Sequence, residues 1–297
     1  MRKSSVALFL LAQFLSPGVG RTQNAPSDSS AVTAQSRYQV TPNVTYLVQN
    51  GYENKLDIYW RRDASGPQPT LFYIHGGGWT GGTKEASFMA VVPWLEMGWS
   101  VVNVEYRLAR ISHAPAAVED CLCALKWAVA HASEYHLDPS KIVTSGDSAG
   151  GHLALMSGVT PDSAGLDREC PSSDASVGLP KVAAIVNWYG ITDVVDLLDG
   201  PNRKPYAVAW LGSATNREEI ARRVSPLTYI RAGLPPILSI QGDADPTVPY
   251  SHSLRLQDEL ITIHGGKHGM FKPEERIRIY DGIRAFLNRH GLPSHAQ

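Results

Sequence analysis

The pentapeptide Gly-Asp-Ser-Ala-Gly at residues 146–150 has the residue types and spacing of a nucleophile elbow. It lies between a short apolar β-type run at 142–144 and a helix-type run at 151–156. Because a serine hydroxyl is a poor nucleophile at neutral pH, it must be held on a tight strand-to-helix turn beside a base and oxyanion donors. Gly146 and Gly150 permit that turn. Ser148 is therefore the predicted nucleophile, although a glycine-rich loop capped by serine is the alternative for this motif alone.

A glycine run, His75-Gly76-Gly77-Gly78-Trp79, directly follows the apolar run 70–74 and is typical of an oxyanion loop. Acyl transfer puts negative charge on the former carbonyl oxygen, which backbone N–H groups of glycines can approach without obstruction. Gly77, Gly78 and Ala149 are the expected donors. A phosphate-binding loop is disfavoured, because neither G-x-x-x-x-G-K-[ST] nor G-x-G-x-x-G is present here. We expect His75 to anchor the loop rather than to act as a base.

Two carboxylates, Asp243 and Asp245, follow the strand-like run 236–240. A catalytic imidazole needs one carboxylate to hold its tautomer and to stabilise its cation during turnover. A metal site is the alternative for such a pair. No Asp, Glu or His cluster of convincing ligand spacing surrounds these aspartates in the sequence, so no metal is expected.

His268 lies in a glycine-rich loop after the run 261–263, where a general base is needed. Imidazole has an unperturbed pKa of about 6.5, so it can exchange protons with serine and leaving group around neutrality. The sequence has ten histidines. Among the others, His152 is expected in helix packing and His264 at a strand end. His268 is therefore the predicted base.

The motif order HGGGW, GDSAGG, GDADPTVP and GGKHG resembles the hormone-sensitive-lipase-like, bacterial esterase branch of the α/β-hydrolase superfamily. The resemblance covers residues 46–291. Segments such as VEYRL at 104–108 and WYGITD at 188–193 resemble feruloyl- and acetyl-xylan-esterase-like members. The resemblance implies an α/β-hydrolase fold and ester hydrolysis without a cofactor.

That family implies a triad of serine, aspartate and histidine, matched here by Ser148, Asp245 and His268. In the family pattern H-G-x-x-D-x-x-V-P, the acid corresponds to Asp245 rather than Asp243. Gln241 replaces the usual histidine of that pattern. We expect this exchange to alter hydrogen bonding in the loop without abolishing the chemistry.

The segment 246–260, between the predicted acid and the last strand, is short for this family. A parallel crossover needs about a dozen residues and a helix-to-strand loop about 2–6, so nothing obvious remains for that loop. We expect the helix within the segment to lose its last turn. Otherwise His268 would be misplaced, and a shift of about 1 Å in a catalytic group costs roughly a hundredfold in rate.

Strand-like and helix-like runs alternate along the chain, which predicts a mostly parallel sheet with helices on both faces. A final helix is expected over 273–288, opened by proline and by acids near its positive end. The expected strands are 55–60, 70–75, 100–106, 141–145, 182–188, 236–241 and 261–264.

The N-terminus is typical of a secretory signal peptide, with Arg2 and Lys3 before the apolar stretch 6–12. That stretch is shorter than the roughly 20 residues of a membrane span. We expect the protein to be secreted or periplasmic, with an uncleaved anchor as the alternative. The predicted organisation is a signal peptide at 1–20, a flexible leader at 21–44 and an α/β-hydrolase domain at 45–297, with little or no N-terminal cap.

Charge and cysteine content constrain partners and redox state. The net charge of −1 gives no electrostatic reason to expect nucleic acid. Cys121 and Cys123 lie two apart on an expected helix and point in different directions, and no zinc or redox motif is formed. One of them could bridge to Cys170 in an oxidising compartment, and a buried free thiol is an equal alternative. Trp210 and Tyr206 are considered as pocket contacts, although core packing is the favoured role of each.

The resulting hypothesis is a serine carboxylesterase that forms an acyl-enzyme. Resemblance alone favours short-chain or aromatic acyl esters, including those of plant polysaccharides. An amide-cleaving hydrolase, such as a formamidase or peptidase, is the alternative enzyme, because pocket loops determine substrate choice. A catalytically weak hydrolase-fold binding module is the alternative of a different class, on account of the short segment 246–260.

Overall fold

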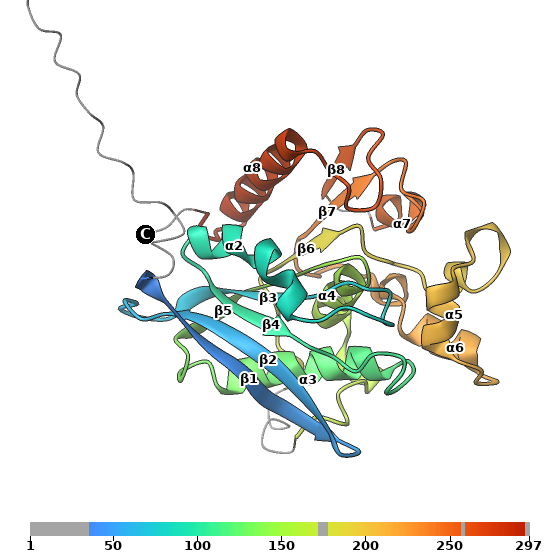
Figure 1. Cartoon of the computed structure of the whole chain (residues 1–297), viewed down its shortest axis with the longest axis horizontal. Helices are drawn as coiled ribbons and strands as arrows, with labels where there is room; N and C mark the ends of the chain where they lie inside the picture. Colours follow the sequence, from blue (N-terminus) through green and yellow to red (C-terminus); the bar gives the residue numbers. More distant parts are fainter. Residues whose placement is uncertain (1–35, 172–177, 257–258, 295–297) are drawn as a thin grey trace, which may run out of the picture.

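The computed structural model describes residues 36–171, 178–256 and 259–294, which form one eight-stranded sheet with helices on both faces (Figure 1). The strand order is β1-β2-β4-β3-β5-β6-β7-β8. The pairs β1·β2 and β2·β4 are antiparallel, and all later neighbours are parallel. The predicted α/β-hydrolase fold with a mostly parallel sheet is confirmed.

All the described strands belong to this sheet, and most are joined by helices. The strands are β1 (Tyr38–Gln49), β2 (Tyr52–Arg61), β3 (Gln68–Ile74), β4 (Ser100–Val104), β5 (Leu137–Asp147), β6 (Ala184–Trp188), β7 (Ile237–Gly242) and β8 (Glu259–Ile263). The α-helices are α2 (Phe88–Glu96), α3 (Ala116–Ala130), α4 (Ala149–Val159), α5 (Pro205–Leu211), α6 (Arg217–Arg223), α7 (Ser251–Leu254) and α8 (Pro273–Arg289). Short 3₁₀ turns are η1 (Glu85–Ser87), η2 (Asp162–Ala164), η3 (Val195–Leu197), η4 (Gly200–Asn202) and η5 (Pro226–Tyr229).

Strand β1 was not expected. It begins at Tyr38, so the sheet starts earlier in the chain than the domain boundary predicted at residue 45. The prediction of a flexible leader is wrong for residues 38–44, because β1 pairs with β2 along its length. β1 is an edge strand with two register shifts and an irregular burial pattern, so the period-2 signal of a strand is weak there. The expected signal peptide at 1–20 and residues 21–35 of the leader lie outside the described residues, and so does the stretch before residue 36 that bears on the expected N-terminal cap.

Two apolar clusters cover the two faces of the sheet. Helices α3 and α4 lie on one face, and α2 and α8 lie on the other (Figure 1). In β3, Phe72 and Ile74 belong to the α3/α4 cluster, whereas Leu71 and Tyr73 belong to the α2/α8 cluster. Because both faces are covered, the strand reads as a continuous apolar run rather than as an alternating one.

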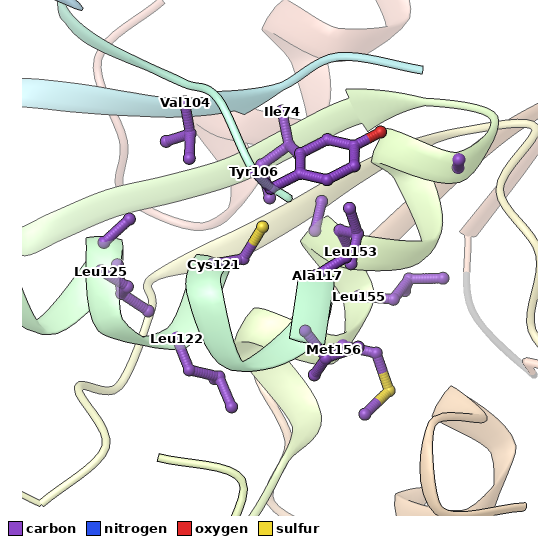
Figure 2. Packing of buried hydrophobic residues seen from close by; sticks show 14 of the residues in the cluster. Ile74, Val104, Tyr106, Ala117, Cys121, Leu122, Leu125, Leu153, Leu155 and Met156 are labelled. Atoms are coloured by element: carbon purple, nitrogen blue, oxygen red, sulfur yellow. The ribbon is translucent and has the colours of Figure 1, made fainter. Parts of the chain in front are cut away.

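Helix α4, which begins directly after Ser148, is held in place mainly by apolar packing. Leu153 and Met156 of α4 lie in one cluster with Leu122 and Leu125 of α3 (Figure 2). Burying each such side chain contributes roughly 1.5–3 kcal/mol relative to exposure. The packing therefore fixes the helix whose first turn carries the predicted site.

The helix before the last strand is as short as expected. α7 has only four residues, and β8 starts at Glu259. β8 nevertheless pairs in parallel with β7, from Leu238 opposite Glu259 to Gly242 opposite Ile263. The loop that carries His268 therefore starts at the same edge of the sheet as the loops before it.

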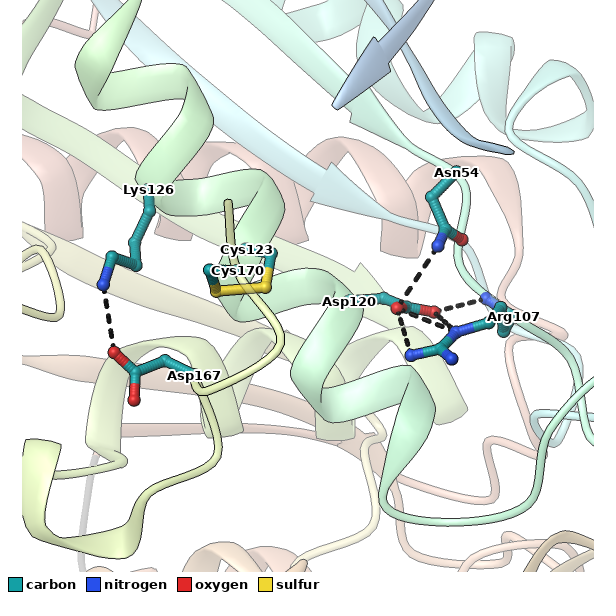
Figure 3. The surroundings of a disulfide bond; sticks show 7 residues. All are labelled: Asn54, Arg107, Asp120, Cys123, Lys126, Asp167 and Cys170. Carbon is teal, nitrogen blue, oxygen red and sulfur yellow. Dashed lines mark hydrogen bonds and ion pairs between the residues drawn. A yellow bond between two sulfur atoms is a disulfide. The ribbon is translucent and has the colours of Figure 1, made fainter. Parts of the chain in front are cut away.

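A disulfide joins Cys123 of α3 to Cys170 (Figure 3). The remaining cysteine, Cys121, is a buried free thiol. Burial raises the pKa of the Cys121 thiol well above its ordinary value, which keeps it unreactive. An ion pair of 3.0 Å between Lys126 and Asp167 lies near the disulfide. The segment after α4 is thereby fastened to α3.

We predict that Cys123→Ala lowers the free energy of unfolding by about 4 kcal/mol, because the bridge links positions 47 residues apart in the chain. Denaturant unfolding of this variant beside Cys121→Ala, which keeps the bridge, measures the difference. Thiol titration of the denatured protein should find only Cys121 before reduction and all three cysteines after it. Equal losses of stability in the two variants would contradict the prediction.

Candidate active site

The structure brings Ser148, Asp245 and His268 together where the parallel strands end. The loops after β5, β7 and β8 supply one residue each, because the carboxyl ends of parallel strands meet at one edge of a sheet. His268 Nε2 lies 2.9 Å from Ser148 Oγ, and His268 Nδ1 lies 2.7 Å from Asp245 Oδ2. The imidazole thus stands between a hydroxyl and a carboxylate, the arrangement that moves a proton off a serine.

Ser148 occupies a strained turn between β5 and α4. Its φ of 55° and ψ of −118° lie outside the usual regions for a residue with a side chain. A Cβ at Gly146 would lie 2.4 Å from the Ile74 carbonyl oxygen, and a Cβ at Gly150 would lie 2.1 Å from the same oxygen. The two glycines are therefore required by the close approach of β3 to the turn.

The glycine run after β3 lies against this turn. Asp147 Oδ1 accepts hydrogen bonds from Gly76 N, at 3.1 Å, and from the Tyr73 hydroxyl, at 3.0 Å. Gly77 has a φ of +118°, where a Cβ would meet the Gly81 carbonyl oxygen at 2.1 Å. Asp147, the residue before Ser148, thus holds the glycine run against the serine turn.

The predicted donors of this site have free backbone N–H groups. Within the part of the chain that the structure describes, no residue accepts a hydrogen bond from Gly77 N, Gly78 N or Ala149 N. Ala149 is the first residue of α4, whose N-terminal N–H groups have no partner inside the helix. These N–H groups are therefore available to an oxygen of a bound molecule.

Of the two aspartates after β7, Asp245 faces His268. Its carboxylate is fully buried, and Oδ1 accepts from the backbone N–H groups of Thr247 and Val248 at 2.7 and 3.0 Å. Asp243 instead pairs with the exposed His264, with 2.9 Å between Oδ2 and Nδ1. This hydrogen bond is the main cause that lowers the pKa of Asp243. His264 follows the last residue of β8, as expected for a strand-end residue.

Gln241, which stands where the family pattern has histidine, holds the loop of Asp245. Its side chain is completely buried in the described structure. Gln241 Nε2 donates to the Val248 carbonyl at 2.8 Å, and Oε1 accepts from the Ser253 hydroxyl of α7. Through these two hydrogen bonds Gln241 connects the loop of Asp245 to helix α7. The expectation that this residue alters the hydrogen bonding of the loop agrees with these contacts.

His152 and Trp210 form the wall behind the glycine run. His152 Nε2 donates to the Val224 carbonyl at 2.6 Å, while Nδ1 accepts from Trp79 Nε1 at 3.2 Å. Burial lowers the pKa of His152 to about 4, so the ring is neutral at pH 7. Trp210 is fully buried and stacks on Trp79 at 4.1 Å between ring centroids. The packing roles expected for His152 and Trp210 are confirmed.

Tyr206 connects the two sides of the site. A Cβ at Gly78 would lie 3.0 Å from Tyr206 Cβ, so the tyrosine borders the glycine run. Its hydroxyl donates to the Thr247 carbonyl in the acid loop at 3.0 Å. Tyr206 is therefore a wall of the site rather than a residue of the core alone.

A pocket of about 740 Å³ adjoins the glycine run and the serine turn. Its apolar wall comes mainly from α2 and from aromatic side chains, and its charged side chains are Asp147 and Arg276. The other lining residues are Tyr73, His75, Gly76, Gly77, Gly82, Thr83, Ala86, Ser87, Met89, Ala90, Pro93, Trp188, Tyr189 and Tyr280. The pocket is large enough for an aromatic group or a sugar ring.

Two residues of the site were missed from the sequence. The Tyr189 ring meets the His268 ring edge-on, with centroids 4.6 Å apart, and Arg276 Nη2 donates to the Gly269 carbonyl at 2.8 Å. Tyr189 directly follows β6, so its place at a strand end was the signal that could have found it. Arg276 carries no such signal, because its contact depends on how α8 docks.

The described residues show neither a metal cluster nor a membrane span. No three or more His, Cys, Asp or Glu side chains of the described part come together in a way that could hold a metal ion. Among the described helices, none combines the length and the apolar character needed to cross a bilayer.

This sheet and its strand-end loops define an α/β hydrolase of the hormone-sensitive-lipase-like esterase type. The chain belongs to the BD-FAE family, which it matches over residues 56–260. It is 31% identical over 252 residues to the Mycobacterium tuberculosis protein named "Probable carboxylic ester hydrolase LipM", covering 82% of this chain and 57% of the relative. The chain thus spans little more than half the length of that relative.

Solved structures agree with this assignment. A truncated carbohydrate esterase from gut microbiota superposes with a TM-score of 0.71 at 25% identity, covering 86% of this chain and 96% of the other. A thermophilic esterase from the Planctomycetes species Thermogutta terrifontis, solved with propionate bound, gives a TM-score of 0.69 at 26% identity, covering 86% and 95%. The family predicted from the motifs is confirmed.

Proposed function

We propose that the protein is a serine carboxylesterase in which Ser148 is the nucleophile, His268 the general base and Asp245 the residue that orients His268. The observation that carries this proposal is the pair of contacts at 2.9 and 2.7 Å that His268 makes with the other two side chains. The relative and the solved structures are named as esterases or ester hydrolases, which supports ester hydrolysis as the reaction.

The proposed reaction has two halves and needs no cofactor. His268 Nε2 takes the proton of Ser148 Oγ while that oxygen bonds to the ester carbonyl carbon, and the backbone N–H groups of Gly77, Gly78 and Ala149 stabilise the oxyanion. The carbonyl re-forms, the alkoxide leaves with the proton from Nε2, and an acyl-enzyme remains. Water, deprotonated by His268, then attacks the acyl carbon, and Ser148 recovers its proton as the acid leaves.

We further propose short-chain or aromatic acyl esters, including those carried by plant polysaccharides, as substrates. The pocket of about 740 Å³ is lined by Gly77 and Asp147 but by neither Ser148 nor His268, so it lies beside the triad, where its aromatic lining suits a flat ring of the substrate. The solved relatives support a short acyl chain and a carbohydrate alcohol, because one holds propionate and another is described as a carbohydrate esterase.

The proposed location is outside the cytoplasm, either secreted or periplasmic. The support is the signal-like sequence at 1–20 and the Cys123–Cys170 disulfide, since disulfides persist mainly in oxidising compartments. Ester substrates on extracellular polysaccharides fit that location.

The decisive test of the function is hydrolysis of p-nitrophenyl acetate by the wild type and by Ser148→Ala. We expect the substitution to lower kcat/KM by more than roughly 10⁴-fold, because the nucleophile is removed. Ser140→Ala is the matched control, since this hydroxyl bonds to Asp138 on the exposed surface. Equal rates for wild type and Ser148→Ala would overturn the esterase proposal, and absence of turnover in both would favour a binding module.

A substrate panel then distinguishes the hypothesis of an esterase from that of an amide-cleaving hydrolase. Acetylated xylan, feruloyl sugars, triglycerides and formyl amides are compared by kcat/KM. We expect the esters with short or aromatic acyl groups to be preferred. A preference for the formyl amide would assign the site to an amide-cleaving hydrolase instead.

The two aspartates after β7 should differ in their effect on catalysis. Asp245→Asn should lower kcat by about 10⁴-fold, because the imidazole would lose the partner that holds its tautomer. Asp243→Asn should leave kcat unchanged, because its partners are the exposed His264 and the Gly265 N–H, from which an asparagine Oδ1 still accepts a hydrogen bond. Steady-state kinetics on p-nitrophenyl acetate measures kcat of both variants. A loss of kcat confined to the Asp243 variant would show that Asp243, and not Asp245, is the carboxylate of the triad.

A further inference from the structure

We propose that Glu105 is a positioning residue for the oxyanion site, and that it acts by holding both ends of the loop 75–84 with a single carboxylate. The inference deepens the proposed function and rests on it, since it assumes that the N–H groups of Gly77 and Gly78 face a developing oxyanion. Glu105 lies directly after β4, outside the glycine run, the serine turn and the acid and base loops.

Each oxygen of the Glu105 carboxylate faces one end of the loop. Oε2 accepts a hydrogen bond of 2.9 Å from the backbone N–H of Lys84, where the loop ends. Oε1 lies 3.3 Å from His75 Nε2, where the loop begins. The second contact is not aligned as a hydrogen bond. Because His75 Nδ1 donates to the Gly76 carbonyl at 2.7 Å, the carboxylate attracts Nε2 when the ring carries both protons, as an ion pair.

Glu105 is itself held by the sheet. Its backbone N–H donates to the Lys55 carbonyl at 3.0 Å, and its carbonyl accepts from the Tyr46 hydroxyl at 2.7 Å. Its side chain is only 18% exposed, so its charge is less screened than at the surface. The backbone of Glu105 is therefore fixed by the sheet, and its carboxylate can restrain the position of the loop.

Both ends of the loop are also immobilised around the carboxylate. The His75 ring stacks on Tyr106 with 4.4 Å between centroids, and the Tyr106 hydroxyl donates to the His75 carbonyl at 3.1 Å. The Lys84 carbonyl accepts from Asn103 Nδ2 at 2.7 Å, and Lys84 Nζ pairs with Asp57 at 2.9 Å. Glu105 joins these two anchored ends to one another.

The backbone between the ends needs such a fastening. Positive φ angles occur at Gly77 (+118°), Gly78 (+59°), Trp79 (+57°) and Gly82 (+93°). Backbone held in these regions is maintained by the structure around it, and a non-glycine residue there costs of order 1–3 kcal/mol. If one end of the loop were released, the N–H groups of Gly77 and Gly78 would move relative to Ser148. That movement would weaken stabilisation of the transition state more than binding of the substrate.

The test compares Glu105→Gln with Glu85→Gln. Glutamine keeps the shape of the side chain but removes the charge and one of the two acceptors facing the loop. Glu85 is the matched control, because it is an exposed glutamate that pairs with Nζ of the same Lys84. We expect Glu105→Gln to lower kcat on p-nitrophenyl acetate by about 10- to 100-fold with little change in KM, and Glu85→Gln to match the wild type.

A second readout separates positioning from general destabilisation. A trifluoromethyl ketone accepts Ser148 Oγ at its carbonyl carbon and so carries an oxyanion in the same place as the intermediate. Its inhibition constant should rise in Glu105→Gln by the same factor as kcat falls. Should that variant fold poorly by circular dichroism, Glu105→Asp, which retains the charge on a shorter stem, is measured in its place and should show a smaller loss of the same kind.

The inference is overturned if kcat and the inhibition constant of the folded Glu105 variant match those of Glu85→Gln. It is also overturned if KM rises while the inhibition constant stays the same. Failure of the proposed function looks different, because wild type and Ser148→Ala would then hydrolyse the ester at equal rates. An active wild type with an inactive Ser148→Ala and an unaffected Glu105→Gln would reject the role of Glu105 alone.

Discussion

The close approach of the Ile74 carbonyl to the turn at Ser148 is the constraint on which the site depends. That oxygen occupies the space where side chains at Gly146 and Gly150 would begin, so β3, β5 and the first turn of α4 can meet only if both positions are glycine. In the turn between these glycines Ser148 has a positive φ of 55°, the strained conformation typical of a nucleophile at a sharp strand-to-helix turn. Packing of α4 on both the sheet and α3 supplies the free energy that maintains this strained turn.

The same approach couples the turn to the glycine run, because β3 ends at Ile74 and the run begins at His75. Asp147 reaches across from the turn to Gly76, and Glu105 reaches from the end of β4 to His75. Neighbouring strand ends therefore hold the loop from two sides. The proposed oxyanion donors Gly77 and Gly78 lie between Gly76, held by Asp147, and Lys84, whose backbone N–H donates to Glu105, so their position depends on the sheet as well as on the loop.

Much of this arrangement could be predicted from the sequence, because its strongest signals are local. The order of the four motifs predicted the fold, the serine turn, the glycine run and the contact of His268 with Asp245. Strand β1 was missed because an edge strand with register shifts carries little periodicity. Tyr189 and Arg276 were missed as site residues, and the role proposed for Glu105 was not foreseen, because these roles come from contacts through space that local motifs do not encode.

The short crossover before β8 shows why one departure from the family pattern does not displace His268. The base loop is fixed mainly from its far side, where α8 begins: Arg276 binds the Gly269 carbonyl, and the Glu275 side chain accepts from Lys272 N. The parallel pairing of β7 with β8 fixes its near side. The helix in between has only to connect the two strands, and Gln241 holds it through the Ser253 hydroxyl. A single turn of helix is therefore sufficient, because the contacts that orient the imidazole arise on either side of it.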